Sequence, residues 1–192
     1  MKVIAFNGSP KKNGNTAKAL KVVFEALNKE GIETELVQVG NSSIKPCIAC
    51  YRCKEKKDGF CYGTENDILN ECLKKIYKSD GIIIGSPVYF GSLTSETKAL
   101  VDRAGYCSRN GGFLLKRKVC AGIAVARRQG ADLVVEQIHN LFAANQCIIP
   151  CSAYWNIALS GASGDISNDE EGINTFRTLG ENMAWLIKKI GT

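Results

Sequence analysis

The stretch MKVIAFNGSPKKNGNT, residues 1–16, decides the fold of this chain. Residues 2–6 form a nearly continuous apolar run, which is typical of a strand buried on both faces of a parallel sheet. The segment 7–10, Asn-Gly-Ser-Pro, ends that strand because Gly and Pro interrupt regular structure. A pattern of helical spacing then begins near Thr16. Unpaired N–H groups and the positive end of a helix dipole meet at such a junction, which therefore suits a phosphate.

The loop of residues 7–16 differs from two familiar nucleotide-binding loops. Gly8 and Gly14 are too far apart for a P-loop, and the fingerprint G-x-G-x-x-G is absent. A loop rich in hydroxyls and amides can instead wrap one terminal phosphate, as flavodoxin-like folds do for FMN. An ordinary polar turn, with Asn15 or Thr16 as the helix cap, is the alternative at this point.

Strands and helices alternate along the rest of the chain. The alternation indicates one α/β domain over residues 1–192, with a doubly wound, five-stranded parallel sheet in the flavodoxin-like order 2-1-3-4-5. Gly31 is expected to end the first helix, and 161–164 to be a flexible connection. The predicted strands are residues 2–6, 32–39, 81–85, 118–126 and 146–153, and the predicted helices are 16–30, 65–78, 94–104, 131–145 and 168–190.

Composition places the chain among globular proteins. Its 192 residues are 45% hydrophobic and 23% charged, with a formal net charge of +6. Lysines are scattered without a long basic run, which argues against a nucleic-acid partner. No apolar stretch approaches the length of a membrane span, and the N-terminus lacks a signal-peptide pattern. We therefore expect a cytoplasmic protein without a membrane partner.

Nine cysteines are the unusual part of the composition. In a reducing cytosol, clustered cysteines indicate metal binding or catalysis more than disulfides. A cysteine-rich excursion at 41–63 carries the pattern C-x2-C-x2-C-x7-C, whose leading part resembles the ligation of bacterial iron–sulfur clusters. A tetrahedral structural zinc, free thiols or a disulfide remain open alternatives. The four cysteines of the motif are Cys47, Cys50, Cys53 and Cys61.

Several other residues are expected to have structural roles. His139 is expected to be structural or at the surface, and Trp155 and Trp185 to lie in the core or an interface. Core packing is the preferred role of the remaining cysteines, Cys72, Cys107, Cys120, Cys147 and Cys151.

The segment 86–92, SPVYFGS, follows the third predicted strand. It supplies backbone amides, a rigid proline and two aromatic rings, which together suit the wall of a flavin site. Core or interface packing is the alternative for each ring taken alone.

Two motifs carry a family resemblance. GSPKKNGNT at 8–16, together with GSPVYFGSLTSETKALVDR at 85–103, resembles the NADPH-dependent FMN reductase family of flavodoxin-like proteins, over essentially the whole chain. The resemblance implies that FMN is the cofactor, with its phosphate held by the first loop and its isoalloxazine lined by the second, next to an unusually basic third loop. In this order, the implied residues are Ser9, Lys11, Asn15 and Thr16; Pro87, Val88, Tyr89, Phe90 and Gly91; and Arg127, Arg128, Gln129 and Gly130.

The cysteine motif resembles that of the iron–sulfur flavoproteins, a branch of the same family with a 4Fe–4S cluster. This resemblance implies electron transfer through FMN and the cluster, from a donor protein such as a ferredoxin to a small-molecule acceptor. It also implies a homodimer or homotetramer, in which the cysteine segment of one subunit approaches the flavin of another. No side chain is required as a general acid or base.

Two other functions remain open. One is an NAD(P)H-dependent FMN or quinone reductase, in which hydride reaches the flavin directly and no cluster is present. The other is a non-enzymatic binding protein whose cysteine loop holds a structural zinc.

Overall fold

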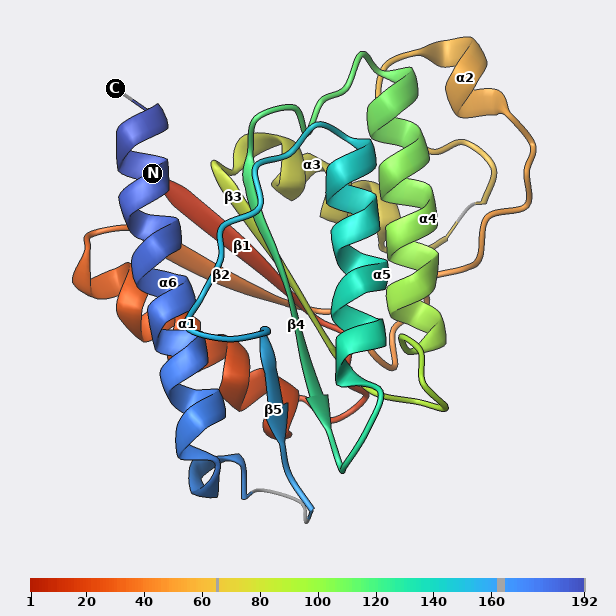
Figure 1. Ribbon diagram of the computed structural model, residues 1–192. Coiled ribbons are helices and arrows are strands. Elements are labelled where there is room, and N and C mark those ends of the chain that lie inside the picture. Colours follow the sequence, from red (N-terminus) through yellow and green to blue (C-terminus); the bar gives the residue numbers. More distant parts are fainter. Residues whose placement is uncertain (65, 162–164, 192) are drawn as a thin grey trace.

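The computed structural model describes residues 1–64, 66–161 and 165–191, and it shows one parallel sheet between two layers of helices (Figure 1). Five strands are hydrogen-bonded in the order β2-β1-β3-β4-β5, as predicted. The strands are β1 (Lys2–Asn7), β2 (Glu33–Gln38), β3 (Gly81–Pro87), β4 (Val119–Ala126) and β5 (Ile157–Leu159). The helices are α1 (Asn15–Lys29), α2 (Arg52–Lys56), α3 (Leu69–Lys78), α4 (Ser95–Asn110), α5 (Ala131–Ala144), the short 3₁₀ turn η1 (Ile166–Asn168) and α6 (Glu170–Ile190).

The apolar strands of the sequence are the central strands of the sheet. Every residue of β4 is buried, and so are nearly all residues of β1 and β3, because helices cover both faces. On one face, α1 and α6 pack on alternate strand residues, and α3, α4 and α5 cover the other face. Each aliphatic side chain that is fully buried in these layers contributes about 1.5–3 kcal/mol relative to exposure. β2, by contrast, lies at the sheet edge and is mostly half-buried, which explains its alternating sequence.

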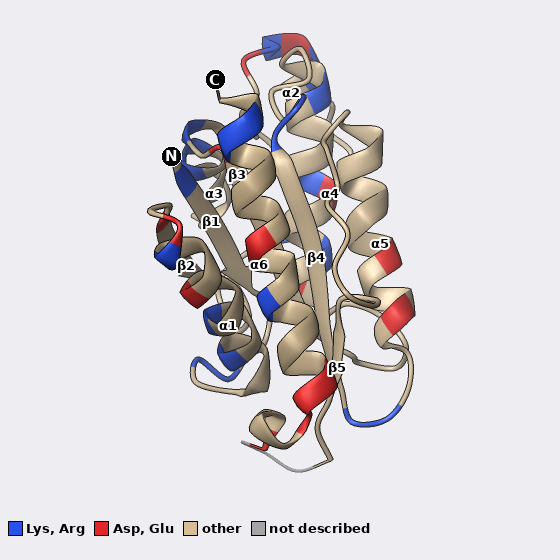
Figure 2. Ribbon diagram, turned by 60° about the vertical axis from the view of Figure 1, so that its left-hand side comes forward, with Lys and Arg blue, Asp and Glu red and all other residues tan. Residues whose placement is uncertain are grey.

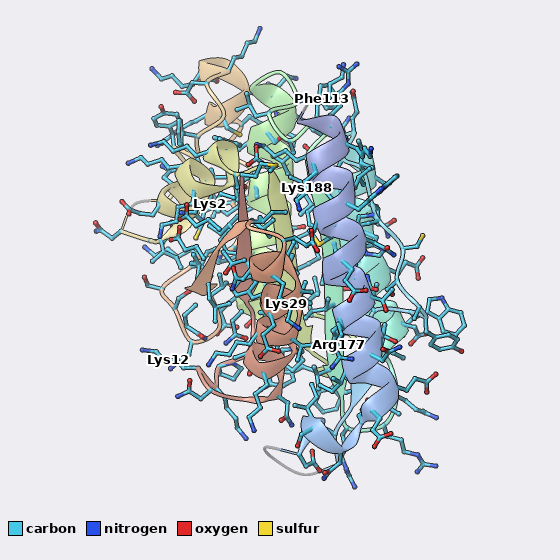
Figure 3. The ribbon with its side chains drawn as sticks, turned by 90° about the vertical axis from the view of Figure 1, so that its left-hand side faces the viewer. Lys2, Lys12, Lys29, Phe113, Arg177 and Lys188 are labelled. Atoms are coloured by element: carbon cyan, nitrogen blue, oxygen red, sulfur yellow. The ribbon has the colours of Figure 1, made fainter. Side chains whose placement is uncertain are left out.

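Parallel strands place the loops that follow β1, β3 and β4 at one edge of the sheet. Gly8, just beyond β1, donates its N–H to the carbonyl of Gly85 in β3 at 2.7 Å, so the first two loops begin side by side. Figure 2 shows the basic stretches of the β1–α1 and β4–α5 loops at the lower end of the molecule. In Figure 3, Lys12 lies at this end, and Phe113, just after α4, lies at the opposite end. We call the first end, with its three loops, the loop end.

The fifth strand is where the prediction was wrong. Of the predicted residues 146–153, only Ile148 forms a bridge, to Val119. The actual strand β5 lies later in the chain, at Ile157–Leu159, and pairs with Ala124–Ala126 of β4. Pro150 interrupts the apolar run because it has no N–H to donate to a neighbouring strand. Gln146 also adopts a positive φ of 61°, which a regular strand does not allow.

Several helix boundaries also differ from the prediction. The N-cap of α1 is Gly14, so neither Asn15 nor Thr16 caps the helix. α3 begins at Leu69, whose N–H is accepted by the Asp67 carboxylate at 3.1 Å, and not near residue 65, which lies outside the described residues. α4 continues to Asn110, six residues beyond its predicted end.

Other local predictions had different outcomes. Gly31 ends the turn after α1 with a φ of +75°, as expected for a helix stop. The excursion at 41–63 contains the short helix α2, so it is not wholly irregular. The predicted flexible connection falls mostly on 162–164, outside the described residues. Within the described part of the chain, no helix has the length and apolar character that crossing a membrane requires.

Candidate functional site

The loop after β1 is held in shape by its own polar groups. The Asn7 side-chain oxygen accepts the N–H of Ser9 at 3.1 Å, and the Ser9 hydroxyl accepts the N–H of Lys11 at 3.2 Å. These turns lead into α1, whose N-cap Gly14 has no side chain and whose first turn contains no carboxylate. The start of α1 is therefore a place where backbone N–H groups favour an anion.

The predicted phosphate residues meet at this junction with different exposures. Ser9 and Thr16 are buried, whereas Lys11 is exposed. Asn15 is the first residue of α1 and donates from its side chain to the Ser160 hydroxyl at 2.6 Å, so it ties the helix to the segment after β5.

Two residues that brace this loop were missed by the sequence analysis. The Gln38 side-chain N–H donates to the carbonyls of Ser9 at 2.6 Å and Gly40 at 2.7 Å, and its oxygen accepts from Asn7 at 2.8 Å. Gly40 lies so close that a Cβ there would stand 2.3 Å from the carbonyl carbon and oxygen of Ser9. A Gln at the end of β2 and a Gly two residues later were the available signals.

The second loop presents an exposed aromatic turn. Tyr89 and Ser92 exchange two backbone hydrogen bonds of 3.0 Å, with Phe90 and Gly91 between them at φ values of 48° and 74°. A turn with two central residues at positive φ suits Gly at its second position but strains a bulky residue at its first. The Phe90 ring is nevertheless held fully in solvent, and Tyr89 is about half exposed.

The second loop contacts both the first loop and the third. The Thr94 hydroxyl, just after the second loop, donates to the carbonyl of Gly8 at 2.8 Å. At Gly130, whose φ is +84°, a Cβ would lie 3.1 Å from a methyl of Val88 and 3.3 Å from the Cα of Gly91. The predicted flavin residues are thus brought together at the loop end, where Arg127, Arg128 and Gln129 are exposed.

A groove of about 1050 Å³ begins at the third loop. It runs between α5 and residues 149–159, past the edge-to-face ring pair Tyr154–Trp155, whose centroids are 4.6 Å apart. His139 borders the groove and is half-buried, and burial lowers the pKa of its imidazole. Trp155 and Trp185 are both more than 60% exposed, so their placement in the core was wrong and an interface role stays a prediction.

The four motif cysteines line one small cavity beside α4. The cavity measures about 30 Å³, and Arg103 and Tyr106 of α4 complete its wall. Cys47 is exposed, Cys50 and Cys61 are half-buried, and Cys53 is buried on α2. At Gly63 a Cβ would stand 2.6 Å from the Cys50 sulfur, so the backbone approaches that sulfur closely. Figure 1 shows α2 next to the C-terminal half of α4, away from the loop end.

Arg103 anchors this segment from inside. It is only 2% exposed, and its guanidinium donates to the Lys45 carbonyl at 2.9 Å and to the Cys61 sulfur at 3.2 Å. It also donates to the Thr64 hydroxyl and forms a buried ion pair with Asp67. Its Nε–H is buried and has no hydrogen-bond partner among the described residues.

Cys107, which the sequence analysis assigned to core packing, is buried on α4 but also contacts the motif. Its thiol donates to the Cys61 sulfur and lies against Cys53. The hydrogen bond from Cys107, with those from the Gly63 N–H and Arg103, outweighs burial and lowers the pKa of Cys61 to about 5. Cys61 is therefore a thiolate at neutral pH, the form that binds metals. Burial raises the pKa of Cys53.

The four thiols of the segment are a donor set that suits an iron–sulfur cluster and also a tetrahedral zinc. Among the described residues, no three His, Cys, Asp or Glu stand close enough together to hold one metal ion. Four thiols nevertheless surround one cavity, and Arg103 is part of its wall.

The remaining cysteines do not join the motif. Cys72 and Cys120 are buried in the core as predicted, and burial raises the pKa of Cys72 to about 12. Cys147 is half-buried and its thiol donates to the Leu115 carbonyl at 3.4 Å, whereas Cys151 is exposed, so core packing was wrong for Cys151.

Known proteins resemble this chain along most of its length. The profile of the NADPH-dependent FMN reductase family matches residues 1–161. An iron–sulfur flavoprotein of Methanocaldococcus jannaschii is 39% identical over 197 aligned positions, which cover 99% of both chains. Another, from Archaeoglobus fulgidus, is 31% identical over 95% of this chain and 94% of its own, and one from Methanosarcina thermophila is 34% identical over 73% and 72%.

Solved structures show the same fold. A flavodoxin, a WrbA-like protein from Agrobacterium tumefaciens, superposes with a TM-score of 0.66 at 16% identity, covering 98% of this chain and 97% of that one. RosB, solved with a bound 8-demethyl-8-formylriboflavin-5'-phosphate intermediate, gives a TM-score of 0.78 at 20% identity, with coverage of 100% and 80%. The chain therefore belongs to the iron–sulfur flavoprotein branch of the NADPH-dependent FMN reductase family and is a flavodoxin-like oxidoreductase.

Proposed function

We propose that this protein transfers electrons through FMN and a 4Fe–4S cluster, from a donor protein such as a ferredoxin to a small-molecule acceptor. The observation that carries the proposal is the meeting of the four motif cysteines around one cavity, with Cys61 held as a thiolate by N–H and S–H donors. The names of the relatives, all iron–sulfur flavoproteins, support it further. NAD(P)H is an additional donor that the family description suggests.

At the loop end, the chain binds and orients FMN within a single domain over residues 1–192. The bound flavin would supply both two-electron and one-electron redox chemistry. The first loop and the N-terminus of α1 hold the phosphate through Ser9, Lys11, Asn15 and Thr16. Residues 87–91 would line the isoalloxazine, with the exposed rings of Tyr89 and Phe90 among them. The exposed third loop, 127–130, adds positive charge beside it.

At the cysteine segment, Cys47, Cys50, Cys53 and Cys61 hold the cluster, which supplies one-electron transfer. Arg103 and the Gly63 N–H orient Cys61. Cys107 completes the apolar wall behind Cys53 and Cys61.

The length of α4 supports an assembly of several copies. Thr94 belongs to the loop end and Cys107 to the cysteine segment, and thirteen residues of helix separate them by about 20 Å. Exposed apolar side chains stand at both ends, Ile48 and Tyr51 at one and Tyr89 and Phe90 at the other. A homodimer or homotetramer that apposes these two regions brings a cysteine segment near the flavin of another subunit.

The test is the cofactor content of protein purified without oxygen. FMN with about four irons and four sulfides per chain is the expected result, the count of one 4Fe–4S cluster. A variant with all four motif cysteines changed to serine should keep FMN and lose iron. FMN without iron, even after anaerobic reconstitution, together with rapid bleaching by NADPH, would instead establish the direct reductase. Zinc without flavin would establish the binding protein.

A further inference from the structure

Arg103 stands out among the lysines and arginines of the described chain, because it is the one that is buried. Burying a guanidinium is costly unless its charge and its N–H groups find partners. On α4, Arg103 finds these partners in a segment far away in the sequence. They lie before and after the cysteine motif.

The contacts of Arg103 join the two ends of the cysteine segment. Lys45 lies before the first motif cysteine, and Thr64 and Asp67 lie after the last one. One side chain thus fixes the entry and the exit of the segment on α4. The Cys61 sulfur is held between these anchors, 3.2 Å from a guanidinium nitrogen.

The donors of Arg103 can be accounted for one by one. A guanidinium has five N–H groups, two on each terminal nitrogen and one on Nε. One terminal nitrogen donates to Lys45 and Asp67, and the other to Cys61 and Thr64. The Nε–H is the remaining donor, and it is buried with no partner among the described residues. An unpaired buried donor is costly, and Arg103 lines the cavity that the four motif cysteines surround.

We infer that Arg103 is a positioning residue of the cluster, which holds Cys61 as the fourth ligand and donates hydrogen bonds to sulfur. This inference rests on the proposed function. Hydrogen bonds to the sulfurs and nearby positive charge stabilise the reduced, more negative cluster. Arg103 therefore raises the reduction potential of the cluster and keeps the motif able to bind it.

The experiment compares variants after anaerobic reconstitution with iron and sulfide. Arg103→Lys keeps the charge but loses the planar set of donors, and Arg103→Gln loses the charge as well. Arg109→Gln on the same helix is the matched control, because Arg109 is exposed and lies over the Phe113 ring at 5.7 Å. FMN, iron and sulfide per chain are measured, together with the midpoint potential of the cluster by an EPR-monitored redox titration.

We expect full FMN content in the Lys and control variants and a more negative midpoint potential in Arg103→Lys than in the parent. Arg103→Gln should bind less iron or show a still more negative potential, and Arg109→Gln should match the parent. A parent-like potential and iron content in both Arg103 variants would overturn the inference while leaving the proposed function intact. A parent protein that takes up no iron would overturn both.

Discussion

Replacing Gly40 by alanine should weaken FMN binding indirectly, through a clash with the backbone of the loop after β1. The new Cβ would stand 2.3 Å from the carbonyl carbon and oxygen of Ser9 and 2.5 Å from the carbonyl oxygen of Gly8. All three atoms belong to backbone, so relief requires the loop after β1 to move away by about 1 Å to reach ordinary contact distance. Overpacking of this kind costs about 1–3 kcal/mol.

If that cost falls on the bound geometry of the loop, the Kd for FMN rises by about 5-fold to 150-fold, since 1.4 kcal/mol corresponds to a factor of ten. The assay is titration of the apoprotein with FMN, followed by quenching of flavin fluorescence. Gly161→Ala is the matched control because no atom of the described residues lies within 4 Å of its Cβ position. Gly40→Ala protein that binds FMN with the Kd of the parent would refute the idea that the end of β2 positions the phosphate loop.

Three further predictions concern the same two regions. Gln38→Ala leaves the carbonyls of Ser9 and Gly40 without their donor, so the free energy of unfolding in urea should fall by about 1–3 kcal/mol; an unchanged urea midpoint would contradict this. Asp67→Asn leaves the buried charge of Arg103 unpaired, and it should lower that free energy by about 3–5 kcal/mol; a loss below 1 kcal/mol would mean that the pair is not buried in solution. The pKa of Cys61 lies at about 5 in the folded chain, below its ordinary value of 9.0, so the stabilisation is complete above pH 9 and is lost as the pH falls toward 5. In reduced, cluster-free protein, thermal unfolding should therefore show a rise of Tm with pH across this window, which the variant Cys61→Ala reduces; equal slopes would contradict the assignment.

The fold was predictable where local sequence and tertiary environment agree. β1, β3 and β4 are continuous apolar runs because both faces of the sheet are covered, and the strand order followed from their alternation with helices. β5 failed for the opposite reason. β5 has only three residues, which are too few to show the alternation of apolar and polar side chains typical of a strand. The apolar residues before Pro150 were therefore predicted as the fifth strand instead.

The candidate site was predictable only as far as residues lie near one another in sequence. The spacing of the four cysteines is a local pattern, and their shared cavity agrees with it. Arg103 lines that cavity and Cys107 contacts Cys61 across forty or more residues of sequence, and no local rule connects such positions. The one available signal was a charged residue next to the apolar stripe formed by Leu100, Ala104 and Cys107. The role of Gln38 was missed for the same reason, because its partner Asn7 belongs to a different strand.

Because α4 is attached near both of its ends, the number of residues between the two attachments is constrained. Thr94 is tied to the first loop, and Arg103 is tied to the cysteine segment. One residue inserted between them would turn Arg103 by about 100° and carry it off the buried face. The segment between Thr94 and Arg103 should therefore tolerate substitutions but not insertions or deletions. Loop movements at either end leave this length unchanged, so the helix itself sets the spacing between the loop end and the cysteine segment of one chain.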